Sequence, residues 1–170
     1  KTLFVTLRNL IFQIVIFIAI FQVASYFRET SMLSTESKIP ASDDLTFKEI
    51  PTISGETVSL TSQGKKTIIY FFAPWCQICH VSIGNLQTTF EKNEQVNVIA
   101  VALDFKDVNE VLDFTKQHQL TFPIALGNEK IKNAFSITAY PSYYVINEQN
   151  TIIGKSLGYS SELGLYLRSL

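Results

Sequence analysis

The sequence predicts an α/β fold with a mixed sheet flanked by helices, and two patterns support this prediction. Short runs of β-branched and aromatic residues, at 67–72 and 96–103, alternate with stretches whose apolar residues recur at helical spacing. This alternation is typical of right-handed βαβ units with helices on both faces of the sheet. The runs 142–147 and 151–156 are joined by a short turn, which adds an antiparallel hairpin to the sheet.

Composition and charge narrow the class of protein. The 170 residues, 46% of them hydrophobic, suffice for one compact domain and an additional segment. Because 14 basic residues are balanced by 15 acidic ones, the basic surface of a nucleic-acid-binding protein is not expected. The 2 cysteines, Cys76 and Cys79, are too few and too close together for a disulfide framework, which suggests reactive thiols.

Residues 1–27 are predicted to contain a transmembrane anchor. The stretch 10–27 carries no charged residue and approaches the ~20 residues needed to cross a bilayer. A cleaved signal peptide is the alternative, because Lys1 and Arg8 are basic and 23–25 resembles a cleavage site. Either interpretation implies that the rest of the chain is exported.

Residues 28–44 are predicted to form a flexible tether, because they are rich in Ser, Thr and charged residues and show no regular apolar period. The compact domain is then expected over 45–170. Its first element is a small hairpin over 47–60, in which apolar residues alternate around a turn at Ser54 and Gly55.

The run 67–72 is predicted to be a strand buried on both faces, and it leads directly to the cysteines. Beyond it, apolar residues fall on one helical stripe, namely Cys79, Ile83, Leu86 and Phe90. The cysteine pair therefore opens a helix. A strand over 96–103, an amphipathic helix from Val108 to near His118 and a short helix over 129–135 follow. Ser161 can cap a final helix.

Cys76 and Cys79 are the candidate catalytic residues. A thiol at a helix N-terminus loses its proton more readily, because the free amides and the helix dipole stabilise negative charge there. Cys76 is therefore the expected nucleophile, and Cys79, sheltered in the apolar stripe, is expected to resolve a mixed disulfide. Trp75 is expected to form a wall beside the sulfur. The alternative is that both cysteines are only packing residues.

The same residues also match Cys-x-x-Cys-His, the pattern of haem attachment in c-type cytochromes. His80 would then be the proximal ligand, and Met32 or His118 the distal one. The β-run before the cysteines argues against that helical class. A zinc site from Cys76, Cys79, His80 and His118 would lack a second close pair of ligands. Without haem, His80 is expected to face solvent and to modulate the acidity of the pair.

Pro141 precedes the strand 142–147, and two interpretations are open. A trans proline at the start of a strand is common. A cis bond between Tyr140 and Pro141 would instead place the Tyr140 backbone where it could pair with an extended substrate segment.

The motifs "YFFAPWCQIC", 70–79, and "AYPSYYVIN", 139–147, resemble the thioredoxin superfamily. The hairpin 50–60 and the stretch 120–137 narrow the resemblance to its membrane-anchored TlpA/ResA-like branch, which includes exported disulfide oxidoreductases similar to ScsD. The resemblance covers 47–170. It implies a thioredoxin-like fold, protein disulfide oxidoreductase activity and no cofactor.

The resemblance also implies roles for single residues. Cys76 corresponds to the nucleophile, Cys79 to the resolving cysteine and Trp75 to a wall of the site. Pro141 corresponds to the cis-proline, with Tyr140 before it contributing to substrate binding.

Several positions depart from the family pattern. Tyr70 stands where thioredoxin has a buried aspartate, Ser82 where ResA-like proteins carry a glutamate, and Gly84 where many relatives have a proline. Gln77 and Ile78 match the intervening residues of neither thioredoxin nor DsbA. The motif therefore does not fix the direction of electron flow.

The expected function is a membrane-anchored thiol-disulfide oxidoreductase that acts on exported proteins, as a reductant by analogy with the branch. The expected location is the bacterial cytoplasmic (inner) membrane, single-pass, with the catalytic domain on the periplasmic or extracytoplasmic side. Expected partners are exported protein thiols and disulfides, with apocytochrome c as a candidate, a membrane redox partner and the lipid bilayer, but no nucleic acid. The alternatives are a membrane-tethered c-type cytochrome and a thiol-based copper-binding or chaperone module.

Overall fold

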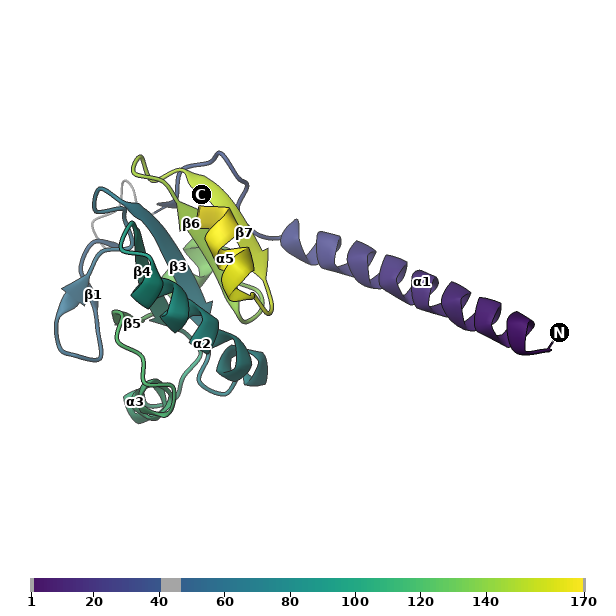
Figure 1. Ribbon diagram of the computed structural model, residues 1–170. Coiled ribbons are helices and arrows are strands. Elements are labelled where there is room, and N and C mark those ends of the chain that lie inside the picture. Colours follow the sequence, from purple (N-terminus) through teal and green to yellow (C-terminus); the bar gives the residue numbers. More distant parts are fainter. Residues whose placement is uncertain (1, 41–46, 170) are drawn as a thin grey trace. The chain divides into compact units, whose positions relative to one another are not determined.

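The computed structural model describes residues 2–40 and 47–169, and the chain divides into two compact units, Lys1–Ser31 and Met32–Leu170 (Figure 1). The helix α1, Thr2–Glu29, covers the apolar run near the N-terminus. Among the described residues, however, no helix is both long enough and apolar enough to cross a membrane. The structure therefore does not support the transmembrane span predicted within 1–27.

The second unit is built on a five-stranded mixed sheet of order β5-β4-β3-β6-β7. The central strand β3, Lys66–Phe72, pairs in parallel with β4, Val96–Ala102, and antiparallel with β6, Ser142–Ile146. At the two edges lie β5, Ile124–Leu126, parallel to β4, and β7, Ile152–Leu157, antiparallel to β6. The predicted mixed sheet is confirmed.

Both faces of the sheet are covered, because side chains along β3 alternate between two core clusters. Ile68, Tyr70 and Phe72 share one cluster with residues of α2, α3 and α5, whereas Ile69 and Phe71 share the other with residues of α4. These helices are α2, Gln77–Lys92, α3, Val108–Gln117, α4, Glu129–Ala134, and α5, Glu162–Ser169. Figure 1 shows α2 and α5 on the same side of the sheet, and they contact each other.

Ser161 accepts a hydrogen bond from the Gly164 amide at 3.2 Å, so the predicted cap of α5 is confirmed. The predicted hairpin over 47–60 is also present, as β1, Ile50–Pro51, paired with β2, Thr57–Val58. Its Thr52 forms an isolated antiparallel bridge with Ala125 of β5. The hairpin therefore lies against an edge of the main sheet.

Residues 32–40 pack on the domain, which differs from the flexible tether predicted over 28–44. Met32 and Ile39 are buried in the same cluster as Ile69 of the central strand. The Ile39 amide donates to the Asn150 carbonyl at 3.0 Å, and the Ile152 amide donates to the Ser37 carbonyl at 2.9 Å. Two apolar side chains among many polar ones therefore hold this segment against the domain. Residues 41–44 of the predicted tether lie outside the described residues.

Candidate active site

The end of β3 delivers the cysteine pair to the N-terminus of α2. Cys76 is the N-cap of the helix, and its Sγ accepts a hydrogen bond from the Cys79 amide at 3.2 Å. Both thiols are free. Cys76 is 6% exposed and Cys79 is fully buried, so the first cysteine lies nearer the surface than the second. The predicted helix and the predicted order of accessibility are both present.

Electrostatics also separate the two thiols. Burial raises the pKa of the Cys79 thiol, and its hydrogen bond with Cys76 raises it further. Cys76 instead stands at the helix end where unpaired amides and the helix dipole favour a negative charge. The arrangement therefore leaves the Cys79 thiol in the protonated form, while Cys76 caps the helix N-terminus.

Trp75 and the segment before β6 flank the cysteines. The Trp75 ring is 61% exposed and meets the Tyr140 ring edge to face, with 5.8 Å between centroids. Tyr140 also packs against the core cluster that contains Cys76 and Cys79. The Tyr140-Pro141 bond is cis, so of the two open interpretations the structure has the second. All five predicted site residues are thus brought together.

Asp104, on the loop after β4, was missed by the sequence analysis. Its main-chain oxygen accepts a hydrogen bond from Trp75 Nε1 at 2.9 Å, and its carboxylate accepts one from the Tyr140 hydroxyl at 2.9 Å. Lys132 of α4 donates to both carboxylate oxygens, at 2.9 and 2.7 Å. The carboxylate also raises the pKa of the Lys132 ammonium, chiefly through this hydrogen bond. No local sequence pattern links these residues, which come from four separate segments.

His80 is half-buried and has partners on both ring nitrogens, whereas the sequence-based expectation was a side chain that faces solvent. Its Nε2 lies 2.9 Å from the Pro74 carbonyl, and its Nδ1 lies 2.8 Å from His118 Nε2. Because a carbonyl can only accept, Nε2 of His80 carries the proton, and in the neutral pair His118 Nε2 donates to His80 Nδ1. Burial, and secondarily the charge of His80, lowers the pKa of His118. The pair therefore holds α3 against the start of α2.

This geometry argues against haem attachment. A proximal His80 would need a free ring nitrogen, but both nitrogens already have partners. Of the distal candidates, His118 contacts His80 itself, and Met32 is buried in the cluster on the other face of the sheet. Neither could bind an iron from the side opposite His80. Among the described residues, no group of three or more His, Cys, Asp or Glu side chains is placed to hold a metal ion.

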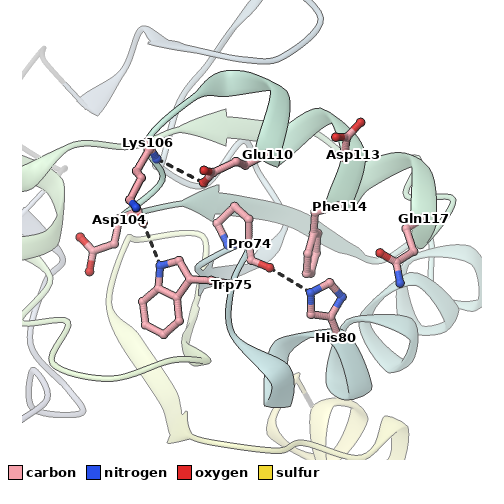
Figure 2. A pocket seen from close by; sticks show the side chains of 9 residues that line it. All are labelled: Pro74, Trp75, His80, Asp104, Lys106, Glu110, Asp113, Phe114 and Gln117. Carbon is pink, nitrogen blue, oxygen red and sulfur yellow. Dashed lines mark hydrogen bonds between the residues drawn. The ribbon is translucent and has the colours of Figure 1, made fainter.

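A pocket of about 470 Å³ opens beside Trp75, between the start of α2 and α3 (Figure 2). Trp75, Pro74, His80 and Phe114 form its apolar and aromatic walls. Charged and polar side chains complete the lining, namely Asp104, Lys106, Glu110, Asp113 and Gln117. The pocket therefore combines aromatic and charged side chains beside Trp75, the residue that precedes Cys76.

Tyr70 and Ser82, two departures from the family pattern, are both buried beside the cysteines. Tyr70 is fully buried in the core cluster of Cys76 and Cys79, and burial, followed by the charge of Cys79, raises the pKa of its hydroxyl. Among the described residues this hydroxyl makes no hydrogen bond of ordinary length and angle, although Ser82 lies near enough to oppose part of the rise in its pKa. Ser82 Oγ accepts a bond from the Ser160 amide at 3.4 Å. At these two positions, Tyr70 and Ser82, the chain therefore carries hydroxyl groups near the buried Cys79 where relatives carry carboxylates.

Comparisons with known proteins agree with this architecture. A sequence model described as the AhpC/TSA family matches residues 41–155. Sporulation thiol-disulfide oxidoreductase A of Bacillus subtilis (strain 168) is 30% identical over 112 residues, which cover 63% of this chain and 68% of that protein. Thiol-disulfide oxidoreductase ResA of Oceanobacillus iheyensis is 26% identical over 151 residues, covering 85% of this chain and 77% of the relative.

Among solved structures, the crystal structure of StoA from Bacillus subtilis superposes with a TM-score of 0.65 at 27% identity. The superposition covers 72% of this chain and 95% of StoA. These relatives confirm the thioredoxin-like fold and the TlpA/ResA-like resemblance that the sequence motifs indicate.

Proposed function

The chain belongs to the AhpC/TSA family and is a thiol-disulfide oxidoreductase, and we propose that Cys76 and Cys79 are its redox pair. One observation carries this proposal. An accessible sulfur caps a helix N-terminus, and a fully buried second sulfur begins the next turn, within reach for a short-range disulfide.

In the reducing direction, the Cys76 thiolate attacks one sulfur of a substrate disulfide. A Cys76-substrate disulfide forms, and the other substrate sulfur leaves as a thiolate and takes a proton. Cys79 then loses its proton, attacks Cys76 Sγ and releases the second substrate thiol. The substrate gains two electrons and two protons, and the protein ends with a Cys76-Cys79 disulfide. Because its pKa is raised, Cys79 stays protonated until the mixed disulfide brings its target within reach.

Substrate binding would use the surface formed by Trp75 and the segment Tyr140-Pro141. An extended segment around the substrate cysteine could pair with the Tyr140 backbone, while Trp75 covers it from the other side. A neighbouring side chain could enter the pocket beside Trp75. The substrates would be exported proteins, with apocytochrome c as a candidate.

The proposed direction is reduction, and the support for it is the resemblance to the TlpA/ResA-like branch. The reduction potential of the purified protein tests this directly. A value near thioredoxin's, about −270 mV, supports a reductant, whereas one near DsbA's, about −120 mV, would make the protein an oxidant.

We also propose attachment to the bacterial cytoplasmic membrane through the N-terminal segment, with the domain on the extracytoplasmic side and a membrane protein as redox partner. The support is the uncharged sequence 10–27. Fractionation of cells producing the full chain tests it. Recovery in the membrane fraction, with protease cleavage of the domain only from outside the cytoplasmic membrane, is expected. Recovery in the soluble cytoplasm would contradict it.

Trapping of mixed disulfides tests the redox pair. A Cys79→Ala variant should accumulate Cys76-linked proteins that reducing agents release. The Cys76→Ala variant and the double variant are matched controls, and neither should trap protein. Equal trapping by the Cys76→Ala variant would show that the roles are reversed.

A further inference from the structure

Asp104 is the residue at which four segments of the site meet. Trp75 comes from the turn before α2, Asp104 from the loop after β4, Lys132 from α4 and Tyr140 from the segment before β6. Every link is short: 2.9 Å from Trp75 Nε1 to the Asp104 main-chain oxygen, 2.9 Å from the Tyr140 hydroxyl and 2.7 Å from Lys132 Nζ to the carboxylate. Trp75, Lys132 and Tyr140, which are far apart in the sequence, are therefore all held in place by hydrogen bonds to Asp104.

The backbone of Asp104 is held in a conformation that favours these contacts. Its φ is +50°, in the left-handed region that residues other than glycine seldom occupy. Such conformations persist when surrounding contacts compensate for their cost. The preceding amide, that of Leu103, donates to the Phe72 carbonyl at 2.9 Å, which fixes the loop to the end of β3. Asp104 thus presents its main-chain oxygen to Trp75 and its carboxylate to Tyr140.

We propose that Asp104 is a positioning residue that sets the separation of Trp75 and Tyr140 and thereby the affinity for a substrate polypeptide. The inference rests on the proposed function, in which these two rings form the surface that binds the substrate beside Cys76. Lys132 keeps the carboxylate in place, because its side chain and that of Asp104 are only 26% and 29% exposed. The Tyr140 hydroxyl then has a fixed, charged acceptor, which fixes the ring against the edge of Trp75.

A carboxylate can accept all of these bonds at once. Lys132 donates to both of its oxygens, and the Tyr140 hydroxyl donates to one of them. An amide has a single oxygen, so its NH₂ group would meet the Lys132 ammonium in either orientation, and in one orientation it would also replace the acceptor of Tyr140. An Asp104→Asn substitution therefore loosens the side chain that holds Tyr140, while the Trp75 bond to the main chain remains.

The experiment measures single-turnover reduction of two disulfides by the reduced full-length protein. One substrate is a peptide of about twelve residues whose central cysteine forms a disulfide with a small thiol, and this peptide can contact Trp75 and Tyr140. The other substrate is a small aromatic disulfide, which is too short to make these contacts. In Asp104→Asn and in Tyr140→Phe, the peptide concentration for half-maximal rate should rise about tenfold, which corresponds to about 1.4 kcal/mol. The rate with the small disulfide should change less than the rate with the peptide, and the plateau rate should fall less than the half-saturation concentration rises.

Two further measurements separate positioning from general loss of structure. The double variant should be no worse than either single one, because both remove the same link. Trp75 is the only tryptophan, so its fluorescence anisotropy should fall in both variants. Tyr166→Phe is the matched control: Tyr166 of α5 lines a pocket with Thr89 and Lys92, at the end of α2 opposite the cysteines, and loss of its hydroxyl should change neither quantity.

An unchanged half-saturation concentration in Tyr140→Phe would overturn the inference, even if Asp104→Asn failed to fold. Equal slowing with the peptide and the small disulfide would also overturn it, because the defect would then lie in the cysteine chemistry. Failure of the unmodified protein to reduce either disulfide would instead count against the proposed function.

Discussion

Cys79 should remain much slower than Cys76 toward alkylation even when its partner is removed. In Cys76→Ala, Cys79 loses the hydrogen bond that is the second cause of its raised pKa, but burial, the first cause, stays. An ordinary thiol with a pKa of about 8.5 is about 3% thiolate at pH 7, and each unit of increase lowers that fraction about tenfold. Because Cys79 is also fully buried, a rate at least about tenfold below that of Cys76 is expected.

The assay is iodoacetamide labelling of Cys76→Ala and Cys79→Ala, followed by mass spectrometry between pH 6 and 9. Each variant leaves one thiol, so the two rates are read without ambiguity. Labelling in a denaturant is the control, since both thiols should then react alike. Equal rates in the native variants would refute the division into an accessible nucleophile and a sheltered resolving thiol.

Three further outcomes are expected for stability. The pKa of His118 is lowered in the folded state, so its contribution to the free energy of unfolding is fully present above the unfolded pKa of about 6.5 and is lost as the pH falls. Urea unfolding at a series of pH values should show this decline in stability, and His118→Gln should make the decline smaller. Tyr143→Phe should lower the free energy of unfolding by about 1 kcal/mol, because Arg168 donates a hydrogen bond to that hydroxyl. Tyr70→Phe, on the paired strand, should leave the free energy of unfolding unchanged or raise it, and equal losses in the two variants would contradict this. Ile39→Ala should cost about 2–4 kcal/mol, and a negligible loss would mean that the segment 32–40 is free after all.

The sequence allowed the order of elements and the cysteine site to be predicted, because both depend on local spacing. The stripe after Cys76 identifies α2, and the run 67–72 identifies β3. The strand β5 was not predicted separately, since Ile124–Leu126 is too short to show a period. Its pairing with β4 is a long-range property.

Long-range contacts also explain what was missed around the cysteines. Asp104 gains its role from Lys132 and Tyr140, which are distant in the sequence. His80 was expected to face solvent because helical spacing alone cannot show that α3 packs against it and supplies His118. The segment 32–40 looked like a linker because its composition is polar, although Met32 and Ile39 are enough to dock it.

The segments that precede β3 have a consequence for solubility. Main-chain groups at the start of β7 bond to residues 36 and 37, and Thr52 bridges to β5, so both outer strands of the sheet are partly occupied. Exposed outer strands are templates for aggregation, because they can recruit strands of other chains. The contacts with residues 36, 37 and 52 therefore leave fewer main-chain groups of β7 and β5 free to pair with another chain.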